Sequence, residues 1–230
     1  MSDRNLQALV ARIPLFSSLD AESRLHVSQL LRTRECRPRE AIVWEGEAGG
    51  SLFLIISGYF KATTMGVGGK ELVFSVMGPG EVFGELSVLD GQPRSASIVA
   101  LQSGELALLE RDALLALLRE SPAVTLQLLL EVCQRLRHLS QRCENLSSLS
   151  VPARLAQVLL DLVRRHGQRS GAAFCIPVRL SQQELGSMVG ATRESVNKQL
   201  KSWIDGGILR RDGGRIVILD PTALQDAAAN

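Results

Sequence analysis

The sequence predicts an α+β protein in which a domain of short strands is followed by a long helix and a compact helical unit. Three observations carry this prediction. Twelve of the twenty glycines lie between Gly46 and Gly104, a stretch after Pro122 repeats its apolar residues at helical spacing, and residues 181–207 read as helix, tight turn, helix. We divide the chain into residues 1–120, 121–150 and 151–230.

Residues 5–35 are expected to be helical in short pieces, because Pro14 interrupts them. Ser18 or Asp20 is expected to cap the second piece. From residue 37 to about residue 109, glycines and prolines punctuate short apolar runs such as AIVW, SLFLIISG and SASIVAL. Runs of this length are typical of short antiparallel strands, so we expect a sandwich, a barrel or a jelly roll.

Helical periodicity begins at Arg111, with one helix that stops near Pro122 and a long helix over about residues 123–150. Apolar residues of the long helix follow alternating steps of three and four: Leu129, Val132, Leu136, Leu139, Cys143 and Leu146. This spacing is the seam of a two-stranded coiled coil, and charged residues occupy the other faces. We therefore expect a homodimer joined along this seam. A core helix that packs on its own domain is the alternative.

The C-terminal region reads as an amphipathic helix over 153–167, a loop and strand, the helix–turn–helix of residues 181–207, and a β-hairpin around Asp212. Ser181 and Glu184 form a capping box, Gly190 suits the tight turn, and Thr192 can cap the second helix. The residues expected to face inward on that helix are Val196, Leu200, Trp203 and Ile204. Those left facing outward are Arg193, Glu194, Asn197, Lys198 and Lys201.

This arrangement predicts DNA binding, because the start of the second helix of such a motif enters the major groove. Arg193 suits guanine, and the carboxylate of Glu194 can accept from cytosine. A wing that reaches phosphates would carry Arg210, Arg211 and Arg215. Residues 150–230 hold 11 Lys/Arg against 7 Asp/Glu, whereas residues 1–149 hold 15 against 17, which also favours a polyanion partner at the C-terminal end. A purely structural helical hairpin is the alternative.

The segment FGELSVLDGQPRSA, residues 83–96, predicts an anion site. Gly84 allows close backbone approach, and Glu85, Leu86 and Ser87 would open a short helical turn after a strand. Arg94 and Ser95 would donate to the anion. Glu85 fits beside a phosphate only if it accepts from a neutral hydroxyl such as a ribose 2′-OH. An anion site with one hydroxyl acceptor describes a cyclic nucleotide; an ordinary strand–turn–strand is the alternative.

The segments SQQELGSMVGATRESVNKQL and FGELSVLDGQPRSA resemble the CRP/FNR superfamily of bacterial transcription regulators, and the resemblance covers about residues 10–220. It implies an N-terminal β-roll (jelly roll) that binds a cyclic nucleotide, a long dimerisation helix, a C-terminal winged helix-turn-helix, and RNA polymerase as a partner. It also implies that Arg193, Glu194 and Lys198 read a palindrome with half-sites like TGTGA. Lys198 departs from the arginine of the catabolite-activator subgroup and acts as a point charge. The expected DNA-binding residues are Ser181, Thr192, Arg193, Glu194, Asn197, Lys198, Lys201 and Arg215.

The resemblance places a Thr-Ser pair against the adenine of cyclic AMP, and this chain has Leu139 and Ser140 there. Cyclic AMP is the first choice of ligand. Cyclic GMP, cyclic di-GMP and a vestigial roll without a ligand remain open. The expected ligand-binding residues are Gly84, Glu85, Leu86, Arg94, Ser95, Leu139 and Ser140.

Several other classes of function are disfavoured. The four cysteines form no CxxC pair and are expected to be buried thiols rather than metal or cluster ligands. No histidine lies between residues 37 and 109, which argues against a cupin metal enzyme, and we expect no metal and no enzymatic activity. No apolar run reaches the ~18–20 residues of a membrane span, and the first residues do not read as a secretory signal. A cytoplasmic location is therefore expected.

Overall fold

The computed structural model describes residues 3–171 and 173–229 and divides the chain into two compact units. The first contains the residues up to Ala62 together with Met77–His138, and the second contains Thr63–Val76 together with Leu139–Asn230. The long helix contributes to both units. The division into residues 1–120, 121–150 and 151–230 therefore stays a prediction.

The N-terminal region is helical only as far as Leu30. Its elements are α1 (Asp3–Arg12), η1 (Pro14–Phe16) and α2 (Ala21–Leu30). Asp20 caps α2, and its carboxylate accepts from the Ser23 amide at 2.7 Å. The prediction of helix up to residue 35 was wrong, because β1 (Arg32–Cys36) is a strand that pairs with β8 (Gly104–Glu110). The segment RTREC contains no apolar run, so only this pairing identifies it as a strand.

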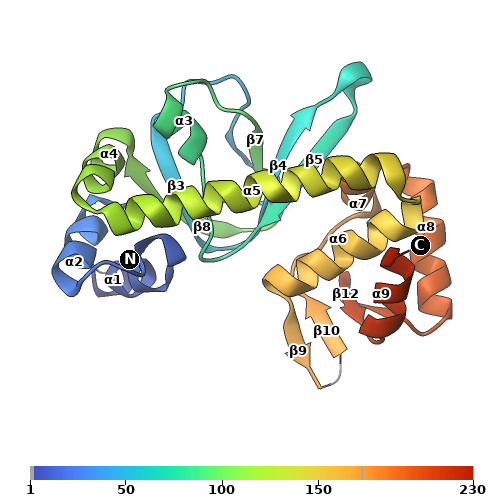
Figure 1. Ribbon diagram of the computed structural model, residues 1–230. Helices are drawn as coiled ribbons and strands as arrows, with labels where there is room; N and C mark the ends of the chain where they lie inside the picture. Colours follow the sequence, from blue (N-terminus) through green and yellow to red (C-terminus); the bar gives the residue numbers. More distant parts are fainter. Residues whose placement is uncertain (1–2, 172, 230) are drawn as a thin grey trace. The chain divides into compact units, whose positions relative to one another are not determined.

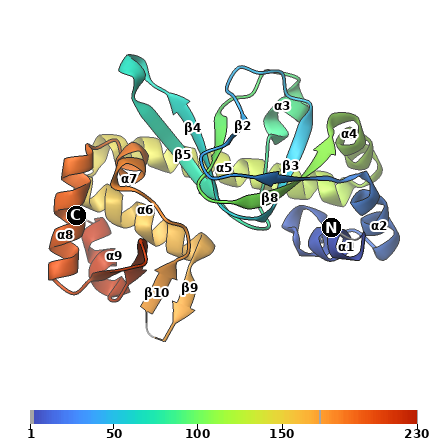
Figure 2. The same cartoon turned by 180° about the vertical axis from the view of Figure 1, so that it is seen from behind.

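The glycine-rich region forms two antiparallel sheets, as the spacing of its strands predicts. One sheet has the order β1, β8, β3 (Ser51–Ser57), β6 (Val82–Phe83), and Figure 2 shows β1, β8 and β3 side by side. The other has the order β2 (Ala41–Val43), β7 (Ser97–Ala100), β4 (Phe60–Met65), β5 (Glu71–Met77), and η2 (Val67–Gly69) connects β4 to β5. The expected β-roll of an α+β protein is confirmed.

Strand β3 is buried on both faces, which explains its continuous apolar sequence. Leu52 and Leu54 pack into the cluster that includes α1, α2 and α4 (Arg111–Glu120). Phe53 and Ile55 alternate with them and point into the interior of the roll. A strand that separates two cores cannot show the alternation of apolar and polar residues typical of a half-exposed strand. The ring of Phe53 stacks on the ring of Phe83 in β6, with centroids 4.8 Å apart.

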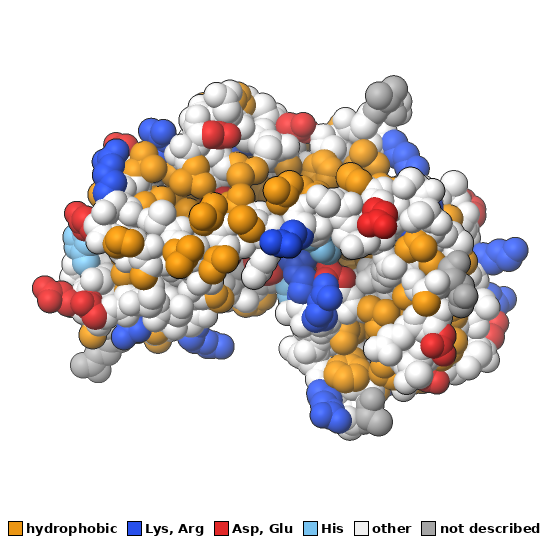
Figure 3. Space-filling view, in the orientation of Figure 1, with side chains coloured by type: hydrophobic (Ala, Val, Ile, Leu, Met, Phe, Trp, Pro, Cys, Tyr) orange, Lys and Arg blue, Asp and Glu red, His pale blue; other side chains and the backbone are white. Residues whose placement is uncertain are grey.

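The long helix α5 (Pro122–Ser148) is unbroken (Figure 1), in agreement with the predicted helix over residues 123–150. Its first turns are anchored by Val124 and Leu128, which are buried in the core of the first unit. Leucines farther along face outward, and hydrophobic side chains gather over the part of α5 in the first unit (Figure 3).

The C-terminal part of the second unit contains α6 (Val151–His166), β9 (Gln168–Ser170), β10 (Ala173–Ile176), α7 (Gln182–Val189), α8 (Arg193–Asp205), β11 (Leu209–Asp212) and β12 (Arg215–Ile218). The strands form a sheet in the order β11, β12, β10, β9. A last helix, α9 (Pro221–Ala229), was not anticipated, and it packs against α6 (Figure 1). The capped helices α7 and α8 and the β11–β12 hairpin agree with the sequence prediction.

The cysteines differ from expectation in one respect. Cys36 is buried in the roll, but Cys133 and Cys175 are half-buried and Cys143 is exposed. The expectation of four buried thiols was wrong because Cys143 lies on the outward face of α5. Within the part of the chain that the structure describes, no single helix is long and apolar enough to cross a membrane; α4 and α5, bent by 115° at their junction, meet the length and composition of a span together.

Candidate functional site

The segment between β6 and β7 forms a tight cassette. Strand β6 ends at Phe83, and Gly84, whose φ of 83° is left-handed, caps α3 (Glu85–Asp90), the short helical turn that was expected. An added Cβ at Gly84 would lie 2.5 Å from Arg94 Nη1 and 3.1 Å from the Ser51 carbonyl oxygen. Glycine is therefore required here both for the backbone conformation and for the approach of the arginine.

Arg94 is buried, with 6% of its surface exposed, and its side-chain hydrogen-bond partners among the described residues are neutral. Its Nη1 donates to the Gly84 carbonyl at 2.9 Å and to Ser87 Oγ at 2.7 Å, and its Nη2 donates to the Ser51 carbonyl at 2.9 Å. Its Nε is buried without a partner among the described residues. Burial lowers the pKa of this guanidinium, an effect that Glu85 and Glu47 oppose. Arginine stays charged even so, and a buried charge is normally matched by an opposite one.

Glu85 is 3% exposed and pairs with Arg135, one of the charged residues expected on the faces of the long helix away from the seam. Arg135 Nη1 of α5 lies 2.6 Å from Glu85 Oε1, and its Nη2 donates to the Val82 carbonyl. The sequence indicated this pair only indirectly, because a buried carboxylate such as that of Glu85 needs a cation beside it. One Glu85 oxygen is thus engaged with Arg135, and the carboxylate keeps further acceptor capacity for a hydroxyl.

A second carboxylate, Glu131, lies one helical turn before Arg135. Burial raises the pKa of Glu131 above its ordinary value of 4.5; the charge of Arg135 opposes this rise, whereas Glu85 and Glu81 add to it. The Glu85–Arg135 pair therefore has a second carboxylate near it, that of Glu131 on α5, and the pKa of Glu131 is raised.

The remaining ligand-binding residues of the prediction lie at the surface. Leu86 is exposed on α3, and Ser95 is exposed next to Arg94. Leu139 and Ser140 are exposed on α5 and belong to the second unit. The structure thus brings together Gly84, Glu85 and Arg94 but not the other four, and the ligand-binding role of all seven residues stays a prediction.

The helix-turn-helix has the local geometry that its sequence predicts. Ser181 accepts from the Glu184 amide at 3.1 Å, and Glu184 Oε2 accepts from the Ser181 amide at 2.8 Å, which completes the capping box. Gly190 has a φ of 65° in the turn, and Thr192 accepts from the Ser195 amide at 3.2 Å to cap α8. The hydroxyls of Ser181 and Thr192, two of the expected DNA-binding residues, are therefore already used at the helix ends.

Helix α8 buries one face and exposes the other. Val196, Leu200 and Trp203 are buried, but Ile204 was wrongly placed inward, since it is 37% exposed near the end of the helix. The expected DNA-facing side chains are all exposed: Arg193, Glu194, Asn197, Lys198 and Lys201.

The carboxylate of Glu194 also stabilises the start of α8. Its pKa lies below the ordinary value because its own backbone amide and the Thr192 hydroxyl donate to it. Glu194 is consequently ionised at neutral pH and can only accept hydrogen bonds.

The β11–β12 hairpin turns at Gly213 and Gly214, whose φ values are 54° and 84°. Arg210 pairs with Asp212 at 3.2 Å, while Arg211 and Arg215 are exposed. The hairpin presents these cations on the same unit as α8, as a wing would.

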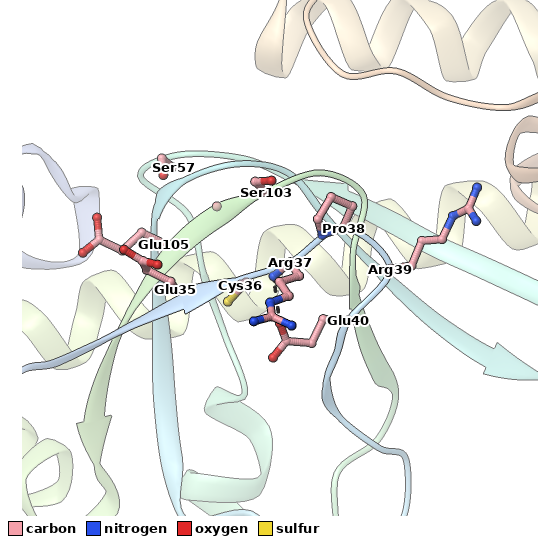
Figure 4. A pocket seen from close by; sticks show the side chains of 10 residues that line it. Glu35, Cys36, Arg37, Pro38, Arg39, Glu40, Ser57, Ser103 and Glu105 are labelled. Carbon is pink, nitrogen blue, oxygen red and sulfur yellow. Dashed lines mark hydrogen bonds between the residues drawn. The ribbon is translucent and has the colours of Figure 1, made fainter.

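A hollow of about 960 Å³ lies elsewhere in the first unit, beside the turn over residues 37–40 (Figure 4). Arg37, Arg39, Glu35, Glu40 and Glu105 line it, so its charges are mixed, and the Arg37 amide donates to Glu40 Oε2 at 2.7 Å. None of the cassette residues lines this hollow. No group of three His, Cys, Asp or Glu side chains in the described part of the chain is arranged to hold a metal ion.

Comparison with known proteins finds one family model for the region of the β-roll and another for the region of the helix-turn-helix. The family model named cyclic nucleotide-binding domain matches residues 33–121, and the Crp-like helix-turn-helix domain matches residues 153–227. A protein of Mycobacterium tuberculosis named CRP-like cAMP-activated global transcriptional regulator is 32% identical over 219 residues, which are 95% of this chain and 98% of that protein. This chain belongs to the CRP family of transcription regulators.

One further relative agrees with that assignment, and a solved structure shares the fold. The cyclic AMP receptor protein of Thermus thermophilus is 32% identical over 215 residues, covering 94% of this chain and 96% of the relative. The solved structure of FixK2 from Bradyrhizobium japonicum has the same fold, with a TM-score of 0.77 at 22% identity, over 87% of this chain and 98% of that one. The CRP-family chain described here thus joins a cyclic nucleotide-binding domain to a DNA-binding helix-turn-helix.

Proposed function

We propose that this regulator binds a palindromic DNA site as a homodimer and that cyclic AMP, bound at the cassette, raises its affinity for that site. The observation that carries the proposal is Arg94, a buried guanidinium whose protein partners are two carbonyls and a hydroxyl. A cyclic phosphate would place a negative charge against the Arg94 guanidinium, and the unpartnered Nε could donate a hydrogen bond to it. Action is by binding, and no catalytic step is part of the proposal.

Cyclic AMP is favoured among the nucleotides because two relatives that match over nearly their whole length are named for it. Glu85 would accept from the ribose hydroxyl with the oxygen atom that Arg135 leaves available. Leu139 occupies the position of the threonine expected against the base, whereas Ser140 retains its hydroxyl. The phosphate and ribose contacts would therefore be kept while one contact to the base is lost.

Titration calorimetry with cyclic AMP, cyclic GMP and cyclic di-GMP tests the ligand. We expect cyclic AMP to bind most tightly and Arg94→Ala to abolish detectable binding at micromolar ligand, since a charge-assisted bond to a buried anion is lost. Cyclic AMP should strengthen DNA binding about 5- to 150-fold, the usual range of such coupling. If another of these nucleotides binds more tightly, that nucleotide and not cyclic AMP is the ligand. If none of the three binds, the result favours a regulator with a vestigial roll.

The dimer is proposed from the outward leucines of α5. Leu129, Leu136, Leu139 and Leu146 are 42–64% exposed in the single chain, although they follow the spacing of a coiled-coil seam. A second copy of the chain would cover them and the thiol of Cys143. Changing Leu136 and Leu139 together to Asp should convert the dimer to a monomer or an aggregate in sedimentation. A well-behaved dimer of this variant would place the interface elsewhere.

The proposed DNA contacts follow from α8 and the wing. Arg193 would donate to a guanine, Glu194 would accept from a cytosine on the opposite strand, and Lys198 would reach a second guanine. Lys201 and Arg215 would contact phosphates. The half-sites, like TGTGA, would lie one helical turn apart, about 34 Å, and selection of bound sequences from a random pool tests this spacing. RNA polymerase as a partner and a location in the cytoplasm are proposed with this function.

A further inference from the structure

The side chain of Gln182 connects the first residue of α7 to the recognition helix α8. Its Nε2 donates to Asn197 Oδ1 at 2.6 Å, and its Oε1 accepts from Arg193 Nε at 3.5 Å. Gln182 is half-buried, whereas Arg193 and Asn197 are exposed and lie one helical turn apart. One amide thus touches two side chains of the surface proposed to face DNA.

The direction of these bonds is determined by Arg193. Arginine has donors and no acceptor, so Gln182 must turn its oxygen toward Arg193 and its NH₂ group toward α8. Asn197 must then turn its own oxygen toward Gln182, which leaves Nδ2 pointing outward. The two amides therefore form a relay in which a permanent cation sets which atom Asn197 presents.

We propose that Gln182 is a positioning residue for base selection, because it makes Asn197 a donor toward DNA and leaves the two Nη groups of Arg193 for guanine. This inference rests on the proposed DNA-binding function of α8. An asparagine that reads adenine with two bonds needs both its oxygen and its nitrogen. With its oxygen held by Gln182, Asn197 instead fits a lone acceptor, such as guanine O6 or N7, adenine N7 or thymine O4, and it disfavours cytosine, whose N4 is a donor.

The variant Gln182→Glu tests the relay, because a carboxylate has no donor. It can still accept from Arg193, but it must now accept from Asn197 Nδ2, so Asn197 turns over and presents its oxygen to the DNA. We expect the base preference at one position of each half-site to move from acceptors toward the donors of cytosine and adenine, by about tenfold. Gln182→Ala should lose the preference at that position without inverting it.

Gln183→Glu is the matched control, since it adds the same charge to the exposed neighbour on the same turn. It should weaken binding to all sequences alike, through repulsion from phosphates, and leave the base preference unchanged. Thermal unfolding of each variant shows whether the second unit remains folded, and Gln182→Ala provides the test if Gln182→Glu does not fold.

Selection from a random DNA pool with wild type and the three variants gives the answer. The inference is supported by a changed preference at one position for the Gln182 variants alone. An unchanged motif in both Gln182 variants, or the same change in Gln183→Glu, overturns it while leaving sequence-specific binding intact. A wild type that selects no motif overturns the proposed function and this inference together.

Discussion

Replacing Gly84 with alanine should displace the Arg94 side chain in the cassette, and the same replacement at Gly80 is the matched control. Gly84 and Gly80 have φ values of 83° and 89°, so alanine at either position adopts a left-handed backbone that costs about 1–2 kcal/mol. At Gly80 the added Cβ meets nothing within 4 Å, whereas at Gly84 it lies 2.5 Å from Arg94 Nη1. Nη1 must move, and it holds the bonds to the Gly84 carbonyl and to Ser87 Oγ.

The difference between the two variants measures the displacement of Arg94. Loss of one hydrogen bond from a charged donor costs about 1.5–3 kcal/mol, so Gly84→Ala should unfold more easily than Gly80→Ala by that amount in urea. If the phosphate of the nucleotide loses a contact of the same strength, its dissociation constant should rise about 10- to 150-fold in Gly84→Ala and stay near wild type in Gly80→Ala. Calorimetry with cyclic AMP provides the second measurement. Equal stability and equal affinity of the two variants would refute the assigned role of Arg94.

Four other predictions concern single side chains. Glu194→Ala should relax selection at one base pair while leaving non-specific binding equal or tighter, and Lys201→Ala should weaken all sequences alike and flatten the salt dependence, both measured on selected and scrambled DNA. Because the folded-state pKa of Glu131 is raised, its contribution to folding stability is present below about pH 4.5 and is lost as the pH rises through the folded-state pKa. Urea unfolding midpoints measured from about pH 4 to 8 should therefore show that Glu131→Gln is more stable than wild type once the pH exceeds that pKa. Ser187 of α7 is 3% exposed, and its hydroxyl has no hydrogen-bond partner within the described chain. Ser187→Ala should therefore raise the free energy of unfolding by about 1 kcal/mol. The control Ser202→Ala, at an exposed position, should raise it by less in the same denaturation assay.

The helix-turn-helix could be predicted almost residue by residue because its signals are local. A capping box at Ser181, a left-handed glycine at 190 and a cap at Thr192 each act within three or four residues. The short strands and the cassette were predictable for a similar reason, since glycine marks the turns and the residues predicted to bind an anion lie in one segment of the chain. Where the sequence lacked a local signal, prediction failed: β1 contains no apolar run, and Ile204 continues the helical period although the helix is about to end.

The sequence by itself determined the fold class, the positions of the cassette and the recognition helix, and the family to which both belong. Only the tertiary structure decided which side chains meet across elements. Arg135 reaches Glu85 from fifty residues away, and Gln182 joins Arg193 to Asn197 across the turn between two helices. Periodicity specifies the face of a helix on which a residue lies, but it does not specify the neighbour packed against that face. Contacts of this kind depend on how separate elements pack, and this is why the charged partner of the cassette and the relay behind the recognition helix could not be predicted from the sequence.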